Sequence, residues 1–362
     1  MAQNPLVTIV TPSYNQAAFL EQTILSVLAQ DYQPVEYLIV DGASTDGSLE
    51  IIRRYADRLA WWASEPDSGQ AEAINKGLQR TKGEIVAWLN SDDLYLPGAV
   101  SQAVAALRAN PDLGMVFGDA ITIDSQGIPL GRLAFGDWGL AELVGFRIIC
   151  QPAVFMRRSV MEKAGWVDPS YHFMLDHHLW IRIARLGPIQ YVGKSSPGQA
   201  TGQPSGLWAA ARHHPAAKNV AQPAGFGKET TRLLEWMQSQ PDLVPLLAEH
   251  RRAVLAGAHR LTARYLLDGG MPGEALKSYG RALLARPSYA LKHWHRMAYA
   301  LICLSGLGGA ADRLRERAMR HKRSNLIREL QQYRIPGDQP TGSESHLSGL
   351  EGWPGLRLDM TQ

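Results

Sequence analysis

The sequence predicts an α/β protein with a mainly parallel sheet, followed by a C-terminal α-helical appendage. Short apolar runs rich in β-branched residues alternate with amphipathic helical stretches over residues 6–93. Such alternation is typical of strands joined by right-handed helical crossovers. Beyond Lys228 the pattern becomes helical. We therefore expect one sheet-containing domain with a helical unit after it.

Composition and charge describe an ordinary globular protein. A chain of 362 residues exceeds the usual single-domain size, and apolar residues make up 45% of it. The formal net charge of +3 gives no reason to expect a nucleic-acid partner. Cys150 and Cys303 form neither a disulfide framework nor a metal cluster, and the N-terminus lacks a signal-peptide pattern. No apolar run reaches the ~20 residues of a membrane-spanning helix. We expect a cytoplasmic protein.

Strands and helices are expected to alternate up to residue 93. The apolar runs predict strands at residues 6–10, 37–40, 59–63 and 85–89. Helical spacing predicts a helix ending near Gln30, a second through Leu49, Ile52 and Tyr55, and a third over residues 70–79. Pro12 and Asn15 act as strand breakers, and Ser44 or Thr45 is expected to cap the second helix.

Three loops follow parallel strands and so meet at one edge of the sheet, where open α/β sheets bind ligands. They read TPSYN, DGASTDG and NSDD. Tyr14 offers a ring face to a base, and Asp41 an acceptor for a base N–H. Asp92 can accept from ribose hydroxyls, and Asp93 can hold a divalent cation against a diphosphate. The sequence has neither a Walker motif nor G-x-G-x-x-G, so a metal is expected to carry the phosphate charge.

Each of these residues also has a plain structural interpretation. Alone, NSDD is more often a turn than a metal site. Tyr14 would then be a half-buried packing aromatic, and Asp41 and Asp46 would cap loops. For Asp46 we favour the cap.

Several segments, in order from about residue 6 to about residue 186, together resemble the family 2 glycosyltransferases of the GT-A fold. They read VTIVTPSYNQ, LIVDGASTDG, SEPDSGQAEAINKG and GEIVAWLNSDD. The resemblance implies a UDP-, GDP- or dTDP-sugar donor, a divalent cation (Mn²⁺ or Mg²⁺) and inversion of the anomeric centre. Two departures stand out: Asp41-Gly42 replaces paired aspartates, and Asn90 replaces the first carboxylate of D-x-D, giving an N-x-D-D variant. We place the metal at Asp93 and the ribose at Asp92.

The family pattern around the donor matches further residues. The expected donor site comprises Pro12, Tyr14, Asn15, Asp41, Asp67, Gly69, Asn75, Lys76, Asn90 and Asp92. Gly69 permits a close backbone approach, and Lys76 is suited to meet a phosphate or a sugar hydroxyl. The alternative is that Asn75-Lys76-Gly77 only ends a helix, where Lys and Gly are both favoured.

Two segments are expected on the acceptor side. Residues 115–119 read as a strand that ends in the carboxylate of Asp119. Gln151-Pro152 interrupts the apolar run 148–155, which predicts a bend next to the site. We expect Asp119 and Gln151 to contact the acceptor or the donor sugar.

Asp176 is the expected general base. It begins a helix with the apolar stripe Leu179, Ile183 and Leu186. The helix dipole keeps a carboxylate ionised there. The resemblance places Asp176, in DHHLW, at the family's base position, and transfer needs a group that removes the proton of the acceptor hydroxyl. The alternative is a simple N-cap, and Asp119 is the competing carboxylate. His177 and His178 point about 100° apart on a helix, which makes them poor joint metal ligands.

The segment from Arg212 to Lys218 resembles the family's R-x-H followed by Lys. His214 then completes the metal site or contacts the diphosphate, and Arg212 and Lys218 add positive charge. The stretch 193–205 is rich in Gly, Pro, Gln and Ser, which predicts a mobile loop, either a lid or a plain surface loop.

We divide the chain into a GT-A domain at residues 1–228, a helical appendage at 229–334 and a disordered tail at 335–362. The appendage resembles a single tetratricopeptide-like helix pair, too little for a free-standing array, so we expect it to pack on the catalytic domain. Residues 297–311 are apolar, and 312–328 carry seven Arg or Lys against two acidic residues. We favour a buried helix followed by a solvated basic one; a membrane-surface anchor is the alternative.

These expectations describe an inverting, metal-dependent glycosyltransferase of bacterial-type surface polysaccharide or glycoconjugate synthesis. It would use a saccharide or lipid-linked acceptor, in the cytoplasm or at the inner face of the membrane. Nucleotidyl transfer to a sugar 1-phosphate would need a glycine- and arginine-rich phosphate loop near the N-terminus, which the sequence lacks. The non-enzymatic alternative is an inactive nucleotide-sugar-binding or scaffold protein. The helical appendage favours it, and Asp176 argues against it.

Overall fold

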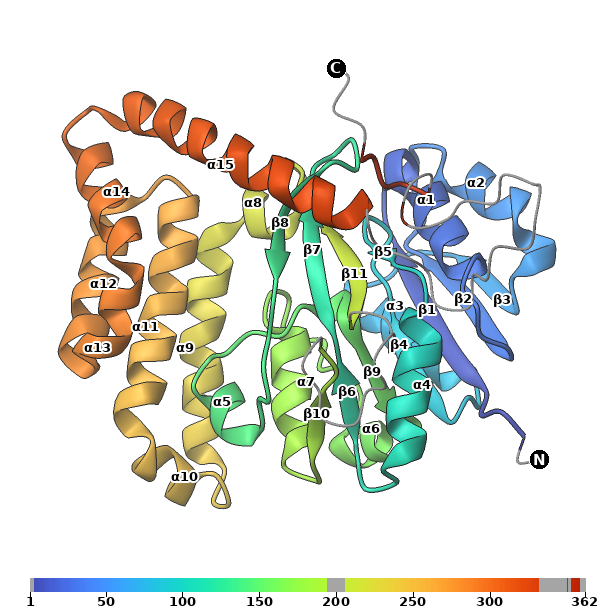
Figure 1. Ribbon diagram of the computed structural model, residues 1–362. Coiled ribbons are helices and arrows are strands. Elements are labelled where there is room, and N and C mark those ends of the chain that lie inside the picture. The colour runs from blue at the N-terminus through green and yellow to red at the C-terminus, as the bar shows by residue number, and fades with distance from the viewer. Residues whose placement is uncertain (1–2, 194–205, 332–349, 351–352, 359–362) are drawn as a thin grey trace.

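The computed structural model describes residues 3–193, 206–331, 350 and 353–358. Its centre is a seven-stranded sheet with the order β10-β6-β9-β4-β1-β2-β3 (Figure 1). These strands are β1 (Val7–Ser13), β2 (Val35–Asp41), β3 (Trp61–Ser64), β4 (Ile85–Trp88), β6 (Met115–Phe117), β9 (Val154–Arg157) and β10 (Ile189–Tyr191). Pairings among β4, β1, β2 and β3 are parallel, whereas β9 runs antiparallel to both β4 and β6. The mainly parallel sheet is therefore confirmed.

β1 runs to Ser13, past the expected end at Val10, and includes Pro12. Its pairing with β4 stops at Val10, opposite Trp88, whereas its pairing with β2 continues to Ser13. The Val10 carbonyl accepts a hydrogen bond from Leu89 N, so it faces β4. Alternate backbone groups of a strand face the same side, so Pro12 also faces β4. Its missing N–H thus lies where β4 no longer pairs, a position that tolerates proline.

A second, four-stranded sheet has the order β5-β11-β7-β8. Its strands are β5 (Leu94–Tyr95), β7 (Asp119–Ile123), β8 (Pro129–Leu133) and β11 (Leu207–Arg212). Asp119 begins β7 and does not end β6, so the expected strand over residues 115–119 is wrong in this respect. The chain changes sheets at Gly118, where a Cβ would lie 2.5 Å from the Trp208 ring. A glycine is therefore needed at this crossing.

Helices cover the large sheet and alternate with its strands. They are α1 (Ala17–Leu28), α2 (Ser48–Arg54), α3 (Gln70–Gln79), α4 (Ala99–Ala109), α5 (Leu140–Val144), α6 (Arg158–Ala164) and α7 (Leu175–Ala184). Short 3₁₀ turns span Ala56–Arg58, Gln151–Ala153 and Leu291–His293. The helix expected over residues 70–79 is confirmed at both ends, and the turn Gln151–Ala153 is the expected bend before β9. The N-cap residue of α2 is Gly47, and the structure shows no side-chain cap there. The expected cap at Ser44 or Thr45 is therefore wrong.

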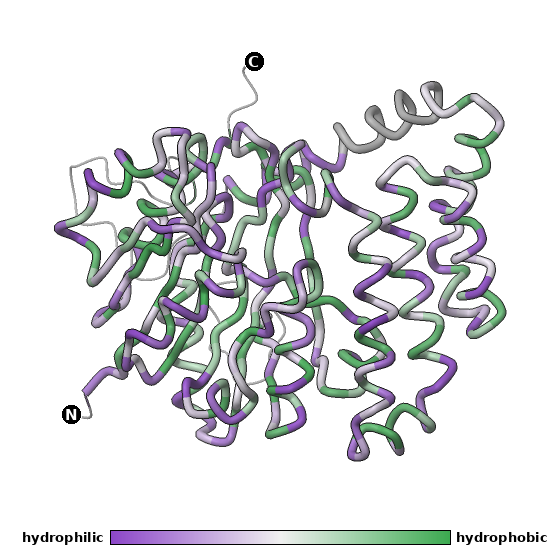
Figure 2. Tube along the Cα trace, turned by 180° about the vertical axis from the view of Figure 1, so that it is seen from behind, coloured by the Kyte–Doolittle hydropathy of each residue, from purple (hydrophilic) through white to green (hydrophobic). Residues whose placement is uncertain are grey.

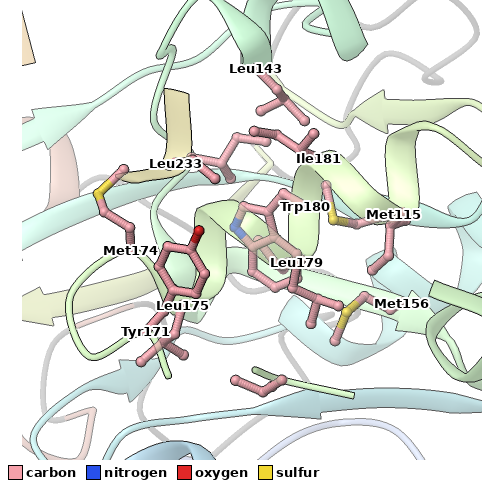
Figure 3. Close-up of a cluster of buried hydrophobic side chains, with 14 of the residues drawn as sticks. Met115, Leu143, Met156, Tyr171, Met174, Leu175, Leu179, Trp180, Ile181 and Leu233 are labelled. Atoms are coloured by element: carbon pink, nitrogen blue, oxygen red, sulfur yellow. The ribbon is translucent and has the colours of Figure 1, made fainter. Parts of the chain in front are cut away.

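α7 packs against the end of β4 through aromatic stacking. The Trp180 ring lies 5.2 Å from that of Trp88, and both side chains are fully buried. Figure 3 shows Trp180 among Leu179, Met115 and Met156 in one apolar cluster. Leu186, expected on the same stripe, lies beyond the helix end and is exposed.

The C-terminal helices stack beside the sheet domain (Figure 1). They are α8 (Lys218–Ala221), α9 (Pro223–Ser239), α10 (Val244–Glu249), α11 (Arg251–Asp268), α12 (Pro272–Ala285), α13 (Pro287–Ala290), α14 (Trp294–Leu304) and α15 (Gly308–Gln331). Residue 228, where we placed the domain boundary, lies inside α9. Leu233 of α9 belongs to the same buried cluster as Leu179 and Trp180 (Figure 3). The appendage therefore packs on the sheet domain, as its helical pattern led us to expect.

α14 differs from the buried helix that we favoured. Ala300 is buried, but Trp294 and Leu301 are 64% and 59% exposed. These two residues lie on one face because they are seven positions apart in a helix. The hydrophobic colouring at this outer end of the molecule is visible in Figure 2. In the part of the chain that the structure describes, no helix combines the length and the apolar character needed to cross a membrane.

α15 returns across the second sheet (Figure 1). Its buried residues Leu326, Ile327 and Leu330 pack in one cluster with Leu350, Trp353, Leu356 and Leu358. The Trp353 indole donates to the Tyr95 carbonyl at 2.8 Å. The described part of the expected tail, residues 350 and 353–358, is thus ordered by burial. The rest of that tail, and residues 194–205 of the expected lid, lie outside the described residues.

Candidate functional site

The loops after β1 and β2 meet at the carboxyl edge of the sheet, as expected. Ser13 and Asp41, the last residues of β1 and β2, are register partners. Asn15 then joins the two loops: its N–H donates to Ser44 Oγ at 2.8 Å, and its Oδ1 accepts from Thr45 N at 2.9 Å. Asn15 adopts a left-handed backbone with φ 51°, which asparagine tolerates well. Asn15 therefore shapes the crevice from within.

Tyr14 projects from this crevice and is 64% exposed. The interpretation as a half-buried packing aromatic is therefore wrong. A ring face of this kind is free to stack on a planar base.

Asp41 is fully buried at the end of β2. Its carboxylate accepts hydrogen bonds from Ser44 N at 2.9 Å, Ser44 Oγ at 2.6 Å and Ser64 Oγ at 2.7 Å. The loop-capping interpretation therefore describes its contacts, and they hold the loop to β3. Asp46 caps as expected, because it accepts from Ala17 N at 2.8 Å and Ser48 N at 3.1 Å.

Asp67 lies next to Gly42, the residue that follows Asp41. A Cβ at Gly42 would lie 2.9 Å from Asp67 Oδ2, so the two loops approach closely there. Asp67 Oδ1 accepts from Gly69 N at 2.8 Å, and burial raises the pKa of Asp67. Gly69 itself has φ 127°, a conformation that favours glycine. This carboxylate thus supports the turn that starts α3.

Asn75 and Lys76 both have partners within the protein. The Asn75 amide donates to the Val167 carbonyl at 2.8 Å and accepts from Val167 N at 3.0 Å. Lys76 pairs with Glu65 at 2.9 Å. Asn75 therefore ties α3 to the segment before α7, a role that neither of our two interpretations included.

Asn90 belongs to a hydrogen-bonded chain that reaches the C-terminal half of the domain. Its Oδ1 accepts from Gln70 Nε2 at 2.6 Å, and Gln70 Oε1 accepts from Lys218 Nζ at 2.8 Å. Sequence reasoning missed Gln70, although it stands within the quoted segment SEPDSGQAEAINKG.

Asp93 points into the protein. It is 6% exposed, and its Oδ1 accepts from the Arg212 backbone N–H at 2.9 Å. Burial, followed by the neighbouring charge of Asp92, raises the pKa of Asp93 well above its usual value. The Arg212 side chain is also buried, and it donates to the Asp92 carbonyl at 2.9 Å and to Gln22 at 2.7 Å. Arg212 therefore organises the Asp92-Asp93 backbone.

Asp92 carries the more accessible carboxylate. Its side chain is 19% exposed, and its Oδ2 lies 3.0 Å from His214 Nε2. The His214 ring packs on Phe19 with centroids 4.7 Å apart. A carboxylate and an imidazole in this arrangement fit a divalent cation that takes its other ligands from a diphosphate and water. Among the described residues no group of three or more His, Cys, Asp or Glu has metal-binding geometry.

Asp176 lies in the first turn of α7, as expected. Its Oδ1 accepts from His177 N at 2.7 Å, and burial raises its pKa to about 6. A carboxyl group with this pKa is ionised at neutral pH and still basic enough to accept a proton. Lys218 lies within electrostatic reach of Asp176, Asp92 and Glu229. One ammonium group therefore feels the charges of both the expected base and Asp92.

The two histidines after Asp176 diverge, as the helix geometry requires. His177 Nε2 lies 3.0 Å from the Leu143 carbonyl, whereas His178 packs between Tyr171 and Trp236 with ring centroids 4.4 Å from each. Burial lowers the pKa of His177 to about 4 and that of His178 to about 3. Both are core residues.

The carboxylate of Asp119 is occupied by hydrogen bonds from three neighbouring residues. It is buried, and it accepts from Arg132 at 2.8 Å, Tyr191 at 2.6 Å and Phe135 N at 3.1 Å. Gln151 donates to the Trp88 carbonyl at 2.8 Å. Its buried Oε1 has no partner within the described residues. Gln151 thus keeps a buried acceptor that no described residue uses, and the contacts of Asp119 are structural.

The comparisons with known proteins agree with this geometry. Residues 8–163 match the model of the family described as "Glycosyl transferase family 2". An uncharacterized glycosyltransferase of Mycobacterium tuberculosis is 29% identical over 192 residues, which cover 51% of this chain and 71% of the relative. The O-antigen biosynthesis protein RfbC of Myxococcus xanthus is 27% identical over 189 residues, 51% of this chain and 15% of the relative. The chain spans 33% of the uncharacterized glycosyltransferase of Rickettsia felis that it also matches.

Solved structures share the fold. A mannosyltransferase from Pyrobaculum calidifontis, in complex with GDP-Man and Mn²⁺, superposes with a TM-score of 0.53 at 20% identity. The match covers 84% of this chain and 87% of that chain. TarS of S. aureus (residues 1–349) gives a TM-score of 0.51 at 14% identity, covering 83% and 91%. The fold is therefore GT-A, and residues 8–163 match the model of glycosyl transferase family 2.

Proposed function

We propose that this protein is an inverting, metal-dependent glycosyltransferase that moves a sugar from a nucleotide diphosphate to an acceptor hydroxyl. The observation that carries the proposal is that Lys218 is linked through Gln70 to Asn90 of the NSDD loop and lies within electrostatic reach of both Asp92 and Asp176. The complex of the related fold with GDP-Man and Mn²⁺ supports a nucleotide-sugar donor and a divalent cation. The O-antigen biosynthesis relative supports a place in polysaccharide synthesis.

We assign the cation to Asp92 and His214, which changes the expected assignment to Asp93. Asp93 faces inward, and its Oδ1 accepts a hydrogen bond from the Arg212 backbone N–H. In contrast, Asp92 Oδ2 lies 3.0 Å from His214 Nε2. When bound, the cation would supply Lewis acidity that stabilises the leaving diphosphate. Lys218, within electrostatic reach of Asp92, adds positive charge toward the same group.

Asp176 removes the proton of the acceptor hydroxyl in this proposal. Its pKa of about 6 leaves it ionised at pH 7. Tyr14 offers its exposed ring to the base of the nucleotide.

The assignment is tested by screening UDP-, GDP- and dTDP-sugars in thermal-shift assays with and without Mn²⁺, because a ligand that binds the native state raises its melting temperature. With the best donor, calorimetry should show that Asp92→Asn weakens Mn²⁺-dependent binding by at least about tenfold. Asp93→Asn is the matched control and should bind nearly normally if it folds. The reverse order would return the metal to Asp93.

An inactive nucleotide-sugar-binding or scaffold protein is the alternative. It would bind the donor with Mn²⁺ but neither transfer nor hydrolyse it. A donor-hydrolysis assay with the best nucleotide-sugar separates the two, because an active transferase releases the nucleotide diphosphate and an inactive binder does not.

We also propose contact with a membrane surface through α14 and the basic segment after it. α14 exposes Trp294 and Leu301, and residues 312–328 carry seven Arg or Lys against two acidic residues. Apolar side chains next to basic ones suit an anionic lipid surface. Salt-sensitive flotation of the full chain with phosphatidylserine vesicles is expected, and Trp294→Ser with Leu301→Ser should reduce it. Equal binding to neutral vesicles would contradict the electrostatic part.

A further inference from the structure

Residues 170–174, the segment before α7, are held by hydrogen bonds from α9. Glu229 of α9 is 8% exposed, and its carboxylate accepts three backbone hydrogen bonds. The donors are His172 N at 2.7 Å, Phe173 N at 2.8 Å and Met174 N at 2.8 Å. A carboxylate that accepts several backbone N–H groups fixes their directions, because each bond is charge-assisted.

Further contacts from α9 reach the same segment. Arg232 donates to the Ser170 carbonyl at 2.6 Å and to Ser170 Oγ at 2.7 Å. The Phe226 ring lies 5.1 Å from that of Phe173. A Cβ at Gly225 would lie 2.2 Å from the Phe173 ring, so only glycine permits this approach. One face of α9 thus packs on and hydrogen-bonds to the turn from Ser170 to Met174.

We propose that Glu229 is a positioning residue for Asp176. Its hydrogen bonds to the backbone of residues 172–174 fix the first turn of α7, which contains Asp176. The inference rests on the proposed role of Asp176 as the base. Asp176 lies two residues after Met174, whose N–H Glu229 holds and whose carbonyl accepts His178 N in the first turn. A base displaced by about 1 Å can lose about 10²-fold in rate. The C-terminal helices therefore belong to the catalytic apparatus and lie beyond the part matched by the family model, residues 8–163.

The electrostatic surroundings of Asp176 agree with this arrangement. Glu229 from α9 and Lys218 from α8 act on it with opposite charges. Cys150 and Tyr265 are two further titratable groups that feel its charge. Glu229 raises the pKa of Asp176 in addition to the larger effect of burial. Loss of the Glu229 charge would therefore move the acid limb of the pH–rate profile to lower pH.

The test compares Glu229→Gln, which removes the charge and one acceptor, with Glu229→Asp, which keeps the charge but shortens the side chain. Glu235→Gln on the exposed face of α9 is the matched control. With the best donor from the screen, Glu229→Gln should lower kcat by about 10- to 100-fold. The Kd for the nucleotide diphosphate with Mn²⁺ should stay within about twofold. Glu229→Asp should lower kcat without moving the acid limb, and Glu235→Gln should change neither.

A double-mutant cycle separates positioning from general stability. If Glu229 acts through Asp176, Glu229→Gln has little further effect on kcat in the Asp176→Asn background. An equal loss of kcat in both backgrounds, or a wild-type kcat and pH profile in folded Glu229→Gln, would overturn the proposal. Should Glu229→Gln fail to fold by circular dichroism, Glu229→Asp carries the same cycle. A wild-type rate of Asp176→Asn alone would instead refute the base assignment, so the two failures are distinguishable.

Discussion

Replacement of Asp176 by Asn changes charge at a single buried position while conserving shape. Asn keeps an oxygen to accept the His177 N–H, now at 2.7 Å, so α7 should form normally. The proton acceptor is lost, and general bases contribute roughly 10²–10⁴-fold in rate. Transfer should fall by about that factor while donor affinity changes little, because the Asp92–His214 pair is untouched.

The same substitution should stabilise the protein at alkaline pH. The folded pKa of about 6 lies above the ordinary value of 3.8, so ionisation of Asp176 opposes folding. Protonated Asp176 makes its full contribution to the free energy of unfolding below pH 4. This contribution is lost as the pH rises through about 6. At pH 8 the gap between the folded and the ordinary pKa of Asp176 corresponds to a loss of about 3 kcal/mol in unfolding free energy, as an upper limit. Asn stays neutral, so Asp176→Asn should melt at a higher temperature than the wild type at pH 8.

Two measurements check this reasoning. Initial rates of nucleotide diphosphate release, taken from pH 5 to pH 9, should show a wild-type acid limb near pH 6 that Asp176→Asn lacks. Thermal unfolding at pH 4 and pH 8 should show the stability gain at pH 8 and little of it at pH 4. A variant that transfers sugar at the wild-type rate, or a stability difference equal at both pH values, would refute the assignment.

Three further changes test the architecture. Asp119→Asn should destabilise the fold by about 1–3 kcal/mol, because the partly buried Arg132 loses one of its two charged partners and keeps only the more exposed Glu329; chemical denaturation measures this, and a folded but inactive variant would revive Asp119 as the base. Leu233→Ala should cost about 2–5 kcal/mol in unfolding free energy, because it opens a cavity beside Trp180 (Figure 3); an unchanged midpoint would mean that α9 does not share the core. Truncation after Gln240 should give an insoluble protein, since it strips buried residues such as Leu261 from the same cluster; soluble, donor-binding protein would contradict this.

Apolar periodicity predicted the strands and helices around the site because local patterns determine them. β2, α3 and β4 follow short runs whose period or β-branched content decides between strand and helix. The parallel order then brings the loops after β1, β2 and β4 to one edge without any further information. Asp176 at the start of α7 could be predicted for the same local reason.

The direction of each polar side chain depended on contacts that no local pattern encodes. Asp93 turns inward because Arg212, far along the chain on β11, presents its N–H there. Asn75 was expected at the donor, but its amide matches the backbone of Val167. Asp119 pairs with Arg132 across two strands. Each of these polar groups is satisfied by a partner distant in sequence, and buried polar groups require such partners.

The sequence by itself therefore determined the α/β class, the edge of the sheet that carries the candidate site and the placement of Asp176 at the start of α7, because repeating local patterns specify them. Only the tertiary structure decided which of Asp92 and Asp93 faces outward, that Glu229 holds the turn before α7, and that α14 leaves Trp294 exposed. Those outcomes follow from which surfaces of distant elements meet, and burial and hydrogen bonding between them set the free energy of each arrangement.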